Sequence, residues 1–143
     1  MAIMGGGIRA GGGGGGQTAR GGNDDVQVVS EAEFEAEVIR SELPVLIEFS
    51  SERSAACKQV APEVVAFARE MEGKVKVVKV DIDKSKLLAR ELRVQSVPTF
   101  MVFVEQRIAD AAAGPISRKK MRTMVEPFLP RAAGAMLTLP RSA

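Results

Sequence analysis

The stretch VLIEFSSERSAACK, residues 45–58, decides the fold of this chain. Its first five residues are apolar except for Glu48, as in a strand that is buried in a parallel sheet. The residues that follow have apolar side chains at helical spacing, namely Val60, Val64, Phe67 and Met71. Val75–Val80 is then rich in β-branched residues. Together these segments predict a parallel strand–helix–strand unit.

Flanking segments extend this unit in both directions. Val26–Val29 predicts a short strand, and Ser30-Glu31-Ala32-Glu33 is a capping box that begins a helix reaching about Arg40. The C-terminal half predicts a short helix, a two-stranded hairpin and a last helix, at Ser85–Leu92, Thr99–Val104 with Ile108–Ala112, and Ser117–Leu129. Pro127 is expected to kink the end of the last helix. The order β-α-β-α-β-α-β-β-α predicts an α/β fold with a central mixed sheet flanked by helices.

The 143 residues predict one domain between two tails. Eleven of the 14 glycines lie in Met1–Gly22. Because glycine loses the most backbone entropy on ordering, residues 1–25 are expected to form a disordered tail. Residues 26–130 are expected to form the domain. Residues 131–143, which include Gly134 and Pro140, are expected to be an irregular C-terminal tail.

The composition excludes several kinds of catalytic and metal site. The chain has no histidine, so Ser-His-Asp and Cys-His catalysis and histidine-containing zinc sites are excluded. Its single cysteine, Cys57, excludes an internal disulfide and a metal cage of several cysteines. We therefore expect no metal and no cofactor. Thiol and carboxylate chemistry are the most natural options that remain.

Charge and hydropathy restrict the expected partners. The last predicted helix begins with a basic cluster, Arg118, Lys119, Lys120 and Arg122, which is either a solvated face or a contact for an acidic partner. With no Tyr or Trp to stack on bases, this small patch does not indicate nucleic-acid binding. No stretch approaches the ~18 apolar residues of a membrane span. Residues 1–22 also lack the apolar run of a secretory signal, so a cytoplasmic location without membrane contact is expected.

Several motifs resemble those of the thioredoxin family. The apolar strand at 45–49, Ser54-Ala55-Ala56-Cys57-Lys58, Pro62 and Val97-Pro98-Thr99-Phe100 occur in the family's order and spacing, within residues 26–130. The resemblance implies the thioredoxin fold. It also implies a Cys-x-x-Cys motif at the start of the central helix, whose first Cys attacks a disulfide and whose second Cys resolves it. In this chain Ser54 stands at the first position and Cys57 at the second.

The serine disables the two-cysteine cycle that the resemblance implies. A serine hydroxyl is not ionised near neutral pH and forms no disulfide, so the dithiol–disulfide couple cannot exist within this chain. Arg53 also stands where the family usually has Trp, and Ala55-Ala56 replaces Gly-Pro. Ser54 fits a plain structural role as a helix N-cap that accepts the backbone N–H of Ala56 or Cys57.

Cys57, Glu48 and Lys79 are the candidate catalytic residues. The first helical turn and Lys58 favour the thiolate of Cys57, whereas burial favours the neutral thiol, so the residue is either inert or reactive. The resemblance implies that Glu48 lies beneath Cys57 as a proton acceptor, a role that a pKa raised by burial would suit. The alternative is a salt bridge between Glu48 and Lys79, which stands where the family has a lysine close to that acid.

The candidate substrate-binding residues are Arg53, Val97, Pro98 and Gly114. Val97 and Pro98 match the family's cis-proline loop, whose backbone pairs with an extended substrate segment. Gly114 matches a family glycine on the same surface, and its alternative role is a plain turn glycine.

Two functions therefore stay open. The first is a binding or adaptor module of the redox-homeostasis family. The second is a one-cysteine thiol–disulfide oxidoreductase, in which an outside thiol resolves a mixed disulfide at Cys57. The expected partner is a protein, or a protein thiol or disulfide. We expect a monomer, with a dimer linked through Cys57 as the alternative. A peroxiredoxin-type reaction is disfavoured, because Ser50 stands where those proteins have Pro.

Overall fold

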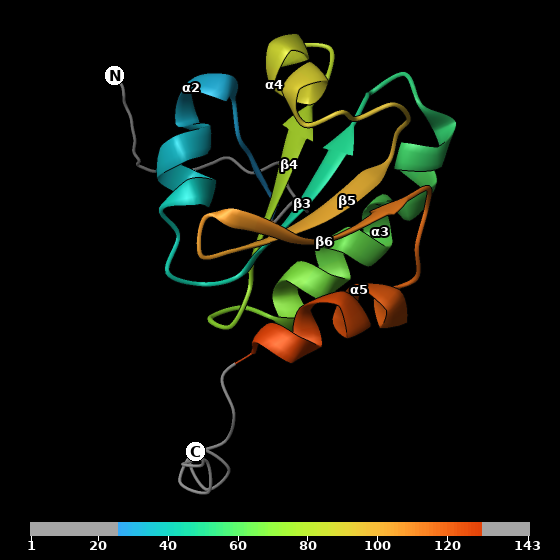
Figure 1. Ribbon diagram of the computed structural model, residues 1–143. Coiled ribbons are helices and arrows are strands. Elements are labelled where there is room, and N and C mark those ends of the chain that lie inside the picture. Colours follow the sequence, from blue (N-terminus) through green and yellow to red (C-terminus); the bar gives the residue numbers. More distant parts are fainter. Residues whose placement is uncertain (1–25, 130–143) are drawn as a thin grey trace, which may run out of the picture.

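The computed structural model of the chain describes residues 26–129 and contains a five-stranded mixed sheet. The sheet has the strand order β2-β4-β3-β5-β6 (Figure 1). The strands are β2 (Gln27–Val28), β3 (Val45–Ser50), β4 (Lys76–Asp81), β5 (Thr99–Val104) and β6 (Arg107–Ala113). β2 and β3 each pair with β4 in parallel, whereas β5 is antiparallel to both β3 and β6. The predicted element order and the central mixed sheet are confirmed.

The helices begin close to the residues that the sequence indicated. They are α2 (Glu31–Phe34), which continues as a π-helical turn over Glu35–Ile39, then α3 (Ala55–Glu70), α4 (Lys86–Glu91) and α5 (Arg118–Val125). The capping box is present, because Ser30 Oγ accepts from the backbone N–H of Glu33 and the Glu33 carboxylate accepts from that of Ser30. After α5, a single 3₁₀ turn over Glu126–Phe128 contains Pro127, so the last predicted helix ends earlier than Leu129.

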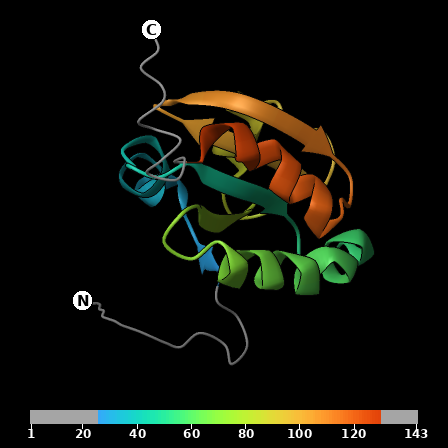
Figure 2. The same ribbon diagram turned by 90° about the horizontal axis from the view of Figure 1, so that it is seen from below.

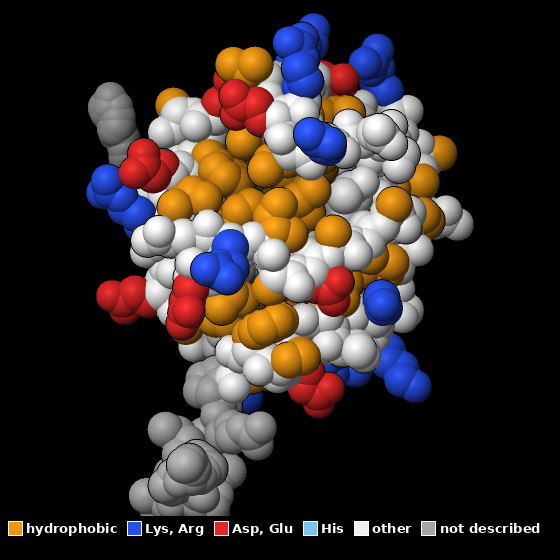
Figure 3. Space-filling model, viewed as in Figure 1, with side chains coloured by type: hydrophobic (Ala, Val, Ile, Leu, Met, Phe, Trp, Pro, Cys, Tyr) orange, Lys and Arg blue, Asp and Glu red, His pale blue; other side chains and the backbone are white. Residues whose placement is uncertain are grey.

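The helices cover the sheet in two layers. α3 and α5 lie side by side on one face, as Figure 2 shows, and α2 and α4 lie on the other. The core under α3 and α5 includes Val64, Phe67 and Met121, packed against Leu46 and Phe100 of the sheet. The second core, under α2 and α4, is formed by Val29, Phe34, Val38, Val45, Ile47, Phe49, Val78, Val80, Met101 and Phe103. In Figure 3 hydrophobic side chains gather on this second face between α2, α4 and the β5–β6 hairpin.

Part of the basic cluster on α5 is paired with α3. Arg122 Nε lies 2.9 Å from Glu70 Oε2, and Arg118 Nε lies 3.6 Å from Glu63 Oε1. These two ion pairs link neighbouring helices across the surface, so half of the predicted cluster has an intramolecular partner. The predicted tails, residues 1–25 and 131–143, lie outside the described residues.

Candidate functional site

The site forms at one end of the sheet, where strand alternation directs polar side chains toward α3. Leu46 belongs to the core under α3, so Glu48 and Ser50, at alternate positions of β3, face the same helix. Lys79 is the register partner of Glu48 on the parallel strand β4, and Val78 and Val80 on either side of it belong to the opposite core. Two of the three candidate catalytic residues are therefore neighbours in the sheet.

α3 begins at this same end of the sheet, shortly after β3 ends at Ser50. Ser54 is its N-cap, and Ser54 Oγ accepts the backbone N–H of Cys57 at 3.1 Å. This bond satisfies one of the free N–H groups at the helix start, as the sequence predicted. Cys57, three residues later, is 6% exposed and has a free thiol. Ala55 is exposed and Ala56 is half-buried, so the first turn is open to solvent on one side only.

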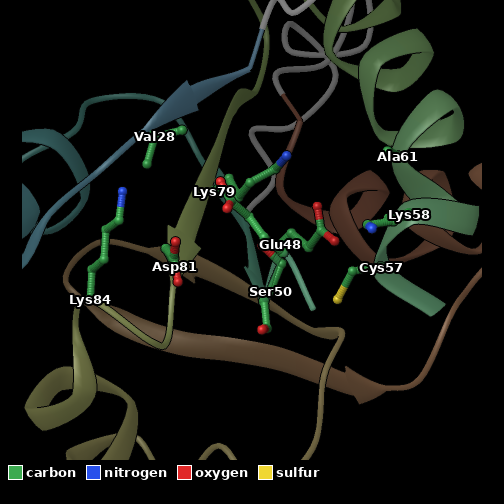
Figure 4. A pocket seen from close by; sticks show the side chains of 11 residues that line it. Val28, Glu48, Ser50, Cys57, Lys58, Ala61, Lys79, Asp81 and Lys84 are labelled. Carbon is green, nitrogen blue, oxygen red and sulfur yellow. The ribbon is translucent and has the colours of Figure 1, made fainter. Parts of the chain in front are cut away.

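Cys57, Glu48 and Lys79 line a common pocket of 530 Å³. Glu48 is 1% exposed and forms part of the pocket's inner wall. Figure 4 shows the Glu48 carboxyl group and the Cys57 thiol on the same side of the pocket, next to Lys58 of α3. The structure therefore brings together the three candidate catalytic residues and places Lys58 of α3 beside them.

Arg53 does not point into this pocket but pairs with a residue that sequence reasoning missed. Its guanidinium Nη2 lies 2.8 Å from Asp83 Oδ1, in the loop after β4. Ser51 Oγ donates to Asp83 Oδ2 at 2.6 Å and accepts the backbone N–H of Arg53 at 3.2 Å. The hydrogen bond from Ser51, and then that from Arg53, hold the pKa of Asp83 below its usual value. This network ties the loop before α3 to the loop after β4.

The candidate substrate-binding loop lies at the same end of the sheet. Thr99 pairs with Phe49, so Pro98 precedes β5 next to the end of β3, close to where the chain turns into α3 (Figure 1). The Val97–Pro98 peptide bond is cis, Val97 is half-buried and Pro98 is buried. Gly114 N donates to Pro98 O at 2.7 Å, with Gly114 at φ +90°. Gly114 therefore contacts the loop directly, and its positive φ also suits a turn.

Neither a metal cluster nor a membrane-spanning helix occurs in the part of the chain that the structure describes. Within residues 26–129, no three His, Cys, Asp or Glu side chains are grouped so that they could hold a metal ion. In the same range, no helix has the length and apolar character needed to cross a membrane.

Comparison with known proteins gives one consistent result. The family model described as thioredoxin matches residues 25–127. This chain belongs to the thioredoxin family. It is 36% identical over 101 residues to a thioredoxin of Synechocystis sp., an alignment that covers 71% of this chain and 94% of the relative. It is also 33% identical over 104 residues to a thioredoxin of Porphyra purpurea, covering 73% and 97% of the two chains.

Membership of the thioredoxin family confirms the α/β thioredoxin fold that the sequence predicted. A thioredoxin of Rickettsia felis is similar over a shorter range, with 36% identity over 86 residues that cover 60% of this chain and 82% of the relative. These 143 residues of a thioredoxin-family chain contain one cysteine. A disulfide between two cysteines within these residues is therefore excluded.

Proposed function

We propose that this thioredoxin-family protein is a binding module in which the two-cysteine disulfide-reductase cycle is disabled. One observation carries the proposal: Ser54 Oγ accepts a hydrogen bond from the backbone N–H of Cys57, at the position where the resemblance to thioredoxins implies an attacking thiol. A hydroxyl in this role caps the helix and takes no part in disulfide exchange. What remains of the site is a surface for recognition.

The loop at Val97 and Pro98 supports a recognition role. It lies at the same end of the sheet as the start of α3, and Gly114 supports it through the hydrogen bond to Pro98 O. A half-buried Val97 at such a place is suited to pair its backbone with an extended segment of a partner protein. The proposed partner is therefore a protein segment rather than a nucleic acid.

The proposal is tested by insulin disulfide reduction with dithiothreitol as the electron source. Wild type and Cys57→Ala should both match the uncatalysed rate, whereas Ser54→Cys should accelerate reduction because it supplies the missing thiol. The double variant Ser54→Cys with Cys57→Ser is the control, since it has an attacking thiol without a resolving one. Wild-type activity that Cys57→Ala abolishes would refute the proposal.

A second candidate, the one-cysteine oxidoreductase, is favoured by the pocket. Cys57 is buried, but it lines an open pocket together with Glu48 and Lys58, so a small reagent has a route to the thiol. In this scheme Glu48 accepts the thiol proton, and a thiol from outside the chain resolves the mixed disulfide.

The rate of Cys57 alkylation by iodoacetamide across a pH series tests this second candidate. A folded rate close to that of the urea-unfolded chain would mean an accessible thiolate, and Glu48→Gln should then lower the folded rate alone. Protection by orders of magnitude in the folded state would rule the candidate out.

A further inference from the structure

The pocket beside Cys57 has charged groups of both signs. Its lining includes three ammonium groups and three carboxyl groups, those of Lys58, Lys79, Lys84, Glu48, Glu52 and Asp81. A site for a purely anionic or purely cationic ligand would present mainly one sign of charge. Equal numbers of the two instead favour a ligand that carries both a carboxylate and an ammonium group.

The thiol lies deep in the pocket, whereas several of the charged groups lie near its opening. Cys57 and Glu48 are buried, whereas Glu52, Lys58 and Lys84 are exposed. In Figure 4 Lys84 and Val28 lie on the side of the pocket opposite to Cys57, with Asp81 on the way between them. A ligand that reaches the thiol with its sulfur would therefore have its polar ends near Asp81 and Lys84.

The size of the pocket restricts the ligand further. A volume of 530 Å³ lies within the range of about 300–1,000 Å³ that is usual for small-molecule sites. The Cys57 thiol is only 6% exposed. A disulfide in a folded protein is hindered from reaching it, because the residues around that disulfide would collide with the rim of the pocket. A small disulfide has no such obstacle.

We propose that this pocket takes a small amino-acid-type disulfide, with both carboxylate and ammonium groups, and that Cys57 is the residue it modifies. The proposal rests on the second candidate function, whose substrate class it names. Lys84 and Asp81 bind the charged ends of the ligand, and Val28, 55% exposed, offers an apolar contact at the opening. The lining of this pocket includes neither Val97 nor Pro98, the residues assigned above to the proposed binding module.

The chemical step is a single thiol–disulfide exchange. The Cys57 thiol loses its proton to Glu48 or to solvent, and the thiolate attacks one sulfur of R–S–S–R. One S–S bond forms between Cys57 and R–S while the S–S bond of the ligand breaks, and R–S⁻ leaves and takes up a proton. Cys57 and the retained half of the ligand end as a mixed disulfide, and the released half is reduced to a thiol.

A matched series of disulfides tests the ligand class on the full chain. Cystine has both charges, cystamine lacks the carboxylates, dithiodipropionate lacks the ammonium groups, and hydroxyethyl disulfide is neutral. The rate of adduct formation is followed by intact-protein mass spectrometry. Each rate is divided by the rate for the urea-unfolded chain, which has no pocket. Cystine should then exceed each of the other three by about fivefold, since it alone can use both kinds of charged contact.

Single charge removals locate the contacts. Lys84→Gln should slow the reaction with cystine and dithiodipropionate about two- to fivefold, and Asp81→Asn should do the same for cystine and cystamine. For each variant the rate is divided by its rate with hydroxyethyl disulfide, a neutral ligand that uses neither charged contact, so that a general change in thiol reactivity cancels. Lys74→Gln removes an exposed lysine outside the pocket and should change no rate.

The outcomes separate this proposal from those it accompanies. If the four normalised rates are equal, the ligand class is wrong while the one-cysteine candidate stands. If no disulfide reacts with the folded chain but all react with the unfolded chain, both fail. The binding-module proposal is tested by the insulin assay instead, and neither of these two results bears on it.

Discussion

At the scale of single residues, Ser54 and Cys57 are linked through one hydrogen bond that spans the first turn of α3. The serine side chain has a structural partner, and the cysteine side chain faces a pocket. The two positions of the motif thus have different surroundings: one stabilises the helix start, and the other is the site of any remaining thiol chemistry.

Ser54→Ala should lower the free energy of unfolding by about 1 kcal/mol, because the backbone N–H of Cys57 then loses its acceptor. Urea unfolding followed by circular dichroism measures this, since the chain has no Trp or Tyr to serve as a fluorescent probe. Ser117→Ala is a matched control at the start of α5, where Ser117 Oγ accepts from Lys120 N. A comparable loss is expected there, whereas unchanged stability of Ser54→Ala would contradict the capping role.

Asp83 should make stability depend on pH in the acid range. Its pKa in the folded chain lies below the ordinary value of 3.8, chiefly through the Ser51 hydroxyl and then through Arg53. Its contribution is therefore fully present above the ordinary value and is lost as the pH falls through the lowered pKa. Asp83→Asn should be less stable than wild type at pH ~7, and the difference should narrow below pH ~4.

Urea midpoints of wild type and Asp83→Asn, taken at intervals from neutral to acid pH, measure this difference. Arg53→Gln removes one of the two partners and should show a smaller difference in the same direction. A difference that is constant over the whole pH range would argue against the proposed role of the carboxylate.

At the scale of elements, the β5–β6 hairpin has a two-residue turn in which both residues have a positive φ although neither is a glycine. Glu105 and Gln106 have φ of +52° and +74°, as in a type I′ turn, although neither is a residue that this turn favours. Gln106→Gly should raise the free energy of unfolding by about 0.5–1 kcal/mol, because glycine tolerates this φ without the Cβ penalty.

Gly73→Ala is the opposite substitution and serves as the control for the hairpin variant. Gly73 has φ +85°, and no atom lies within 4 Å of the position that an added Cβ would take, so the methyl group meets open space. This substitution should therefore destabilise the protein by about 1 kcal/mol through backbone strain alone. Thermal unfolding should move in opposite directions for the two variants, and a shift of both in the same direction would exclude this explanation.

The sequence predicted the elements well because their signals are local. The capping box, the apolar run of β3 and the helical spacing of Val60, Val64 and Phe67 all act within a few residues. The π-helical turn after α2, in which Arg40 N donates to Glu35 O, leaves no such local signal, because the same residues suit an ordinary helix.

The candidate site was predicted only in part. Cys57, Glu48 and Lys79 followed from the family resemblance. The bonds of Asp83 to Arg53 and Ser51 join residues 30 and 32 positions apart. They depend on the parallel pairing of β3 with β4, which sets the two following loops side by side. The contributions of Asp81 and Lys84 to the pocket depend on the same pairing.

At the scale of the whole molecule, the described residues 26–129 contain two hydrophobic cores, one on each face of the sheet. A fragment of residues 26–130 should therefore unfold in one cooperative transition, with a free energy within about 1 kcal/mol of the full chain. Urea unfolding of the two proteins under identical conditions checks this. A fragment that is unfolded, or that has lost several kcal/mol, would contradict the proposed domain boundaries.

The strand β6 lies at one edge of the sheet, opposite to β2, where unpaired backbone groups can act as a template for another chain. Gly114 N is directed toward Pro98, so by alternation the N–H of Ala111 points outward, and it donates to Asp110 Oδ1 at 2.8 Å. The register shift at Val102 and Phe103 also twists this edge. The Asp110 side chain thus occupies one outward N–H group of β6, and the register shift makes this edge irregular. Both features oppose edge-to-edge aggregation when the protein is concentrated.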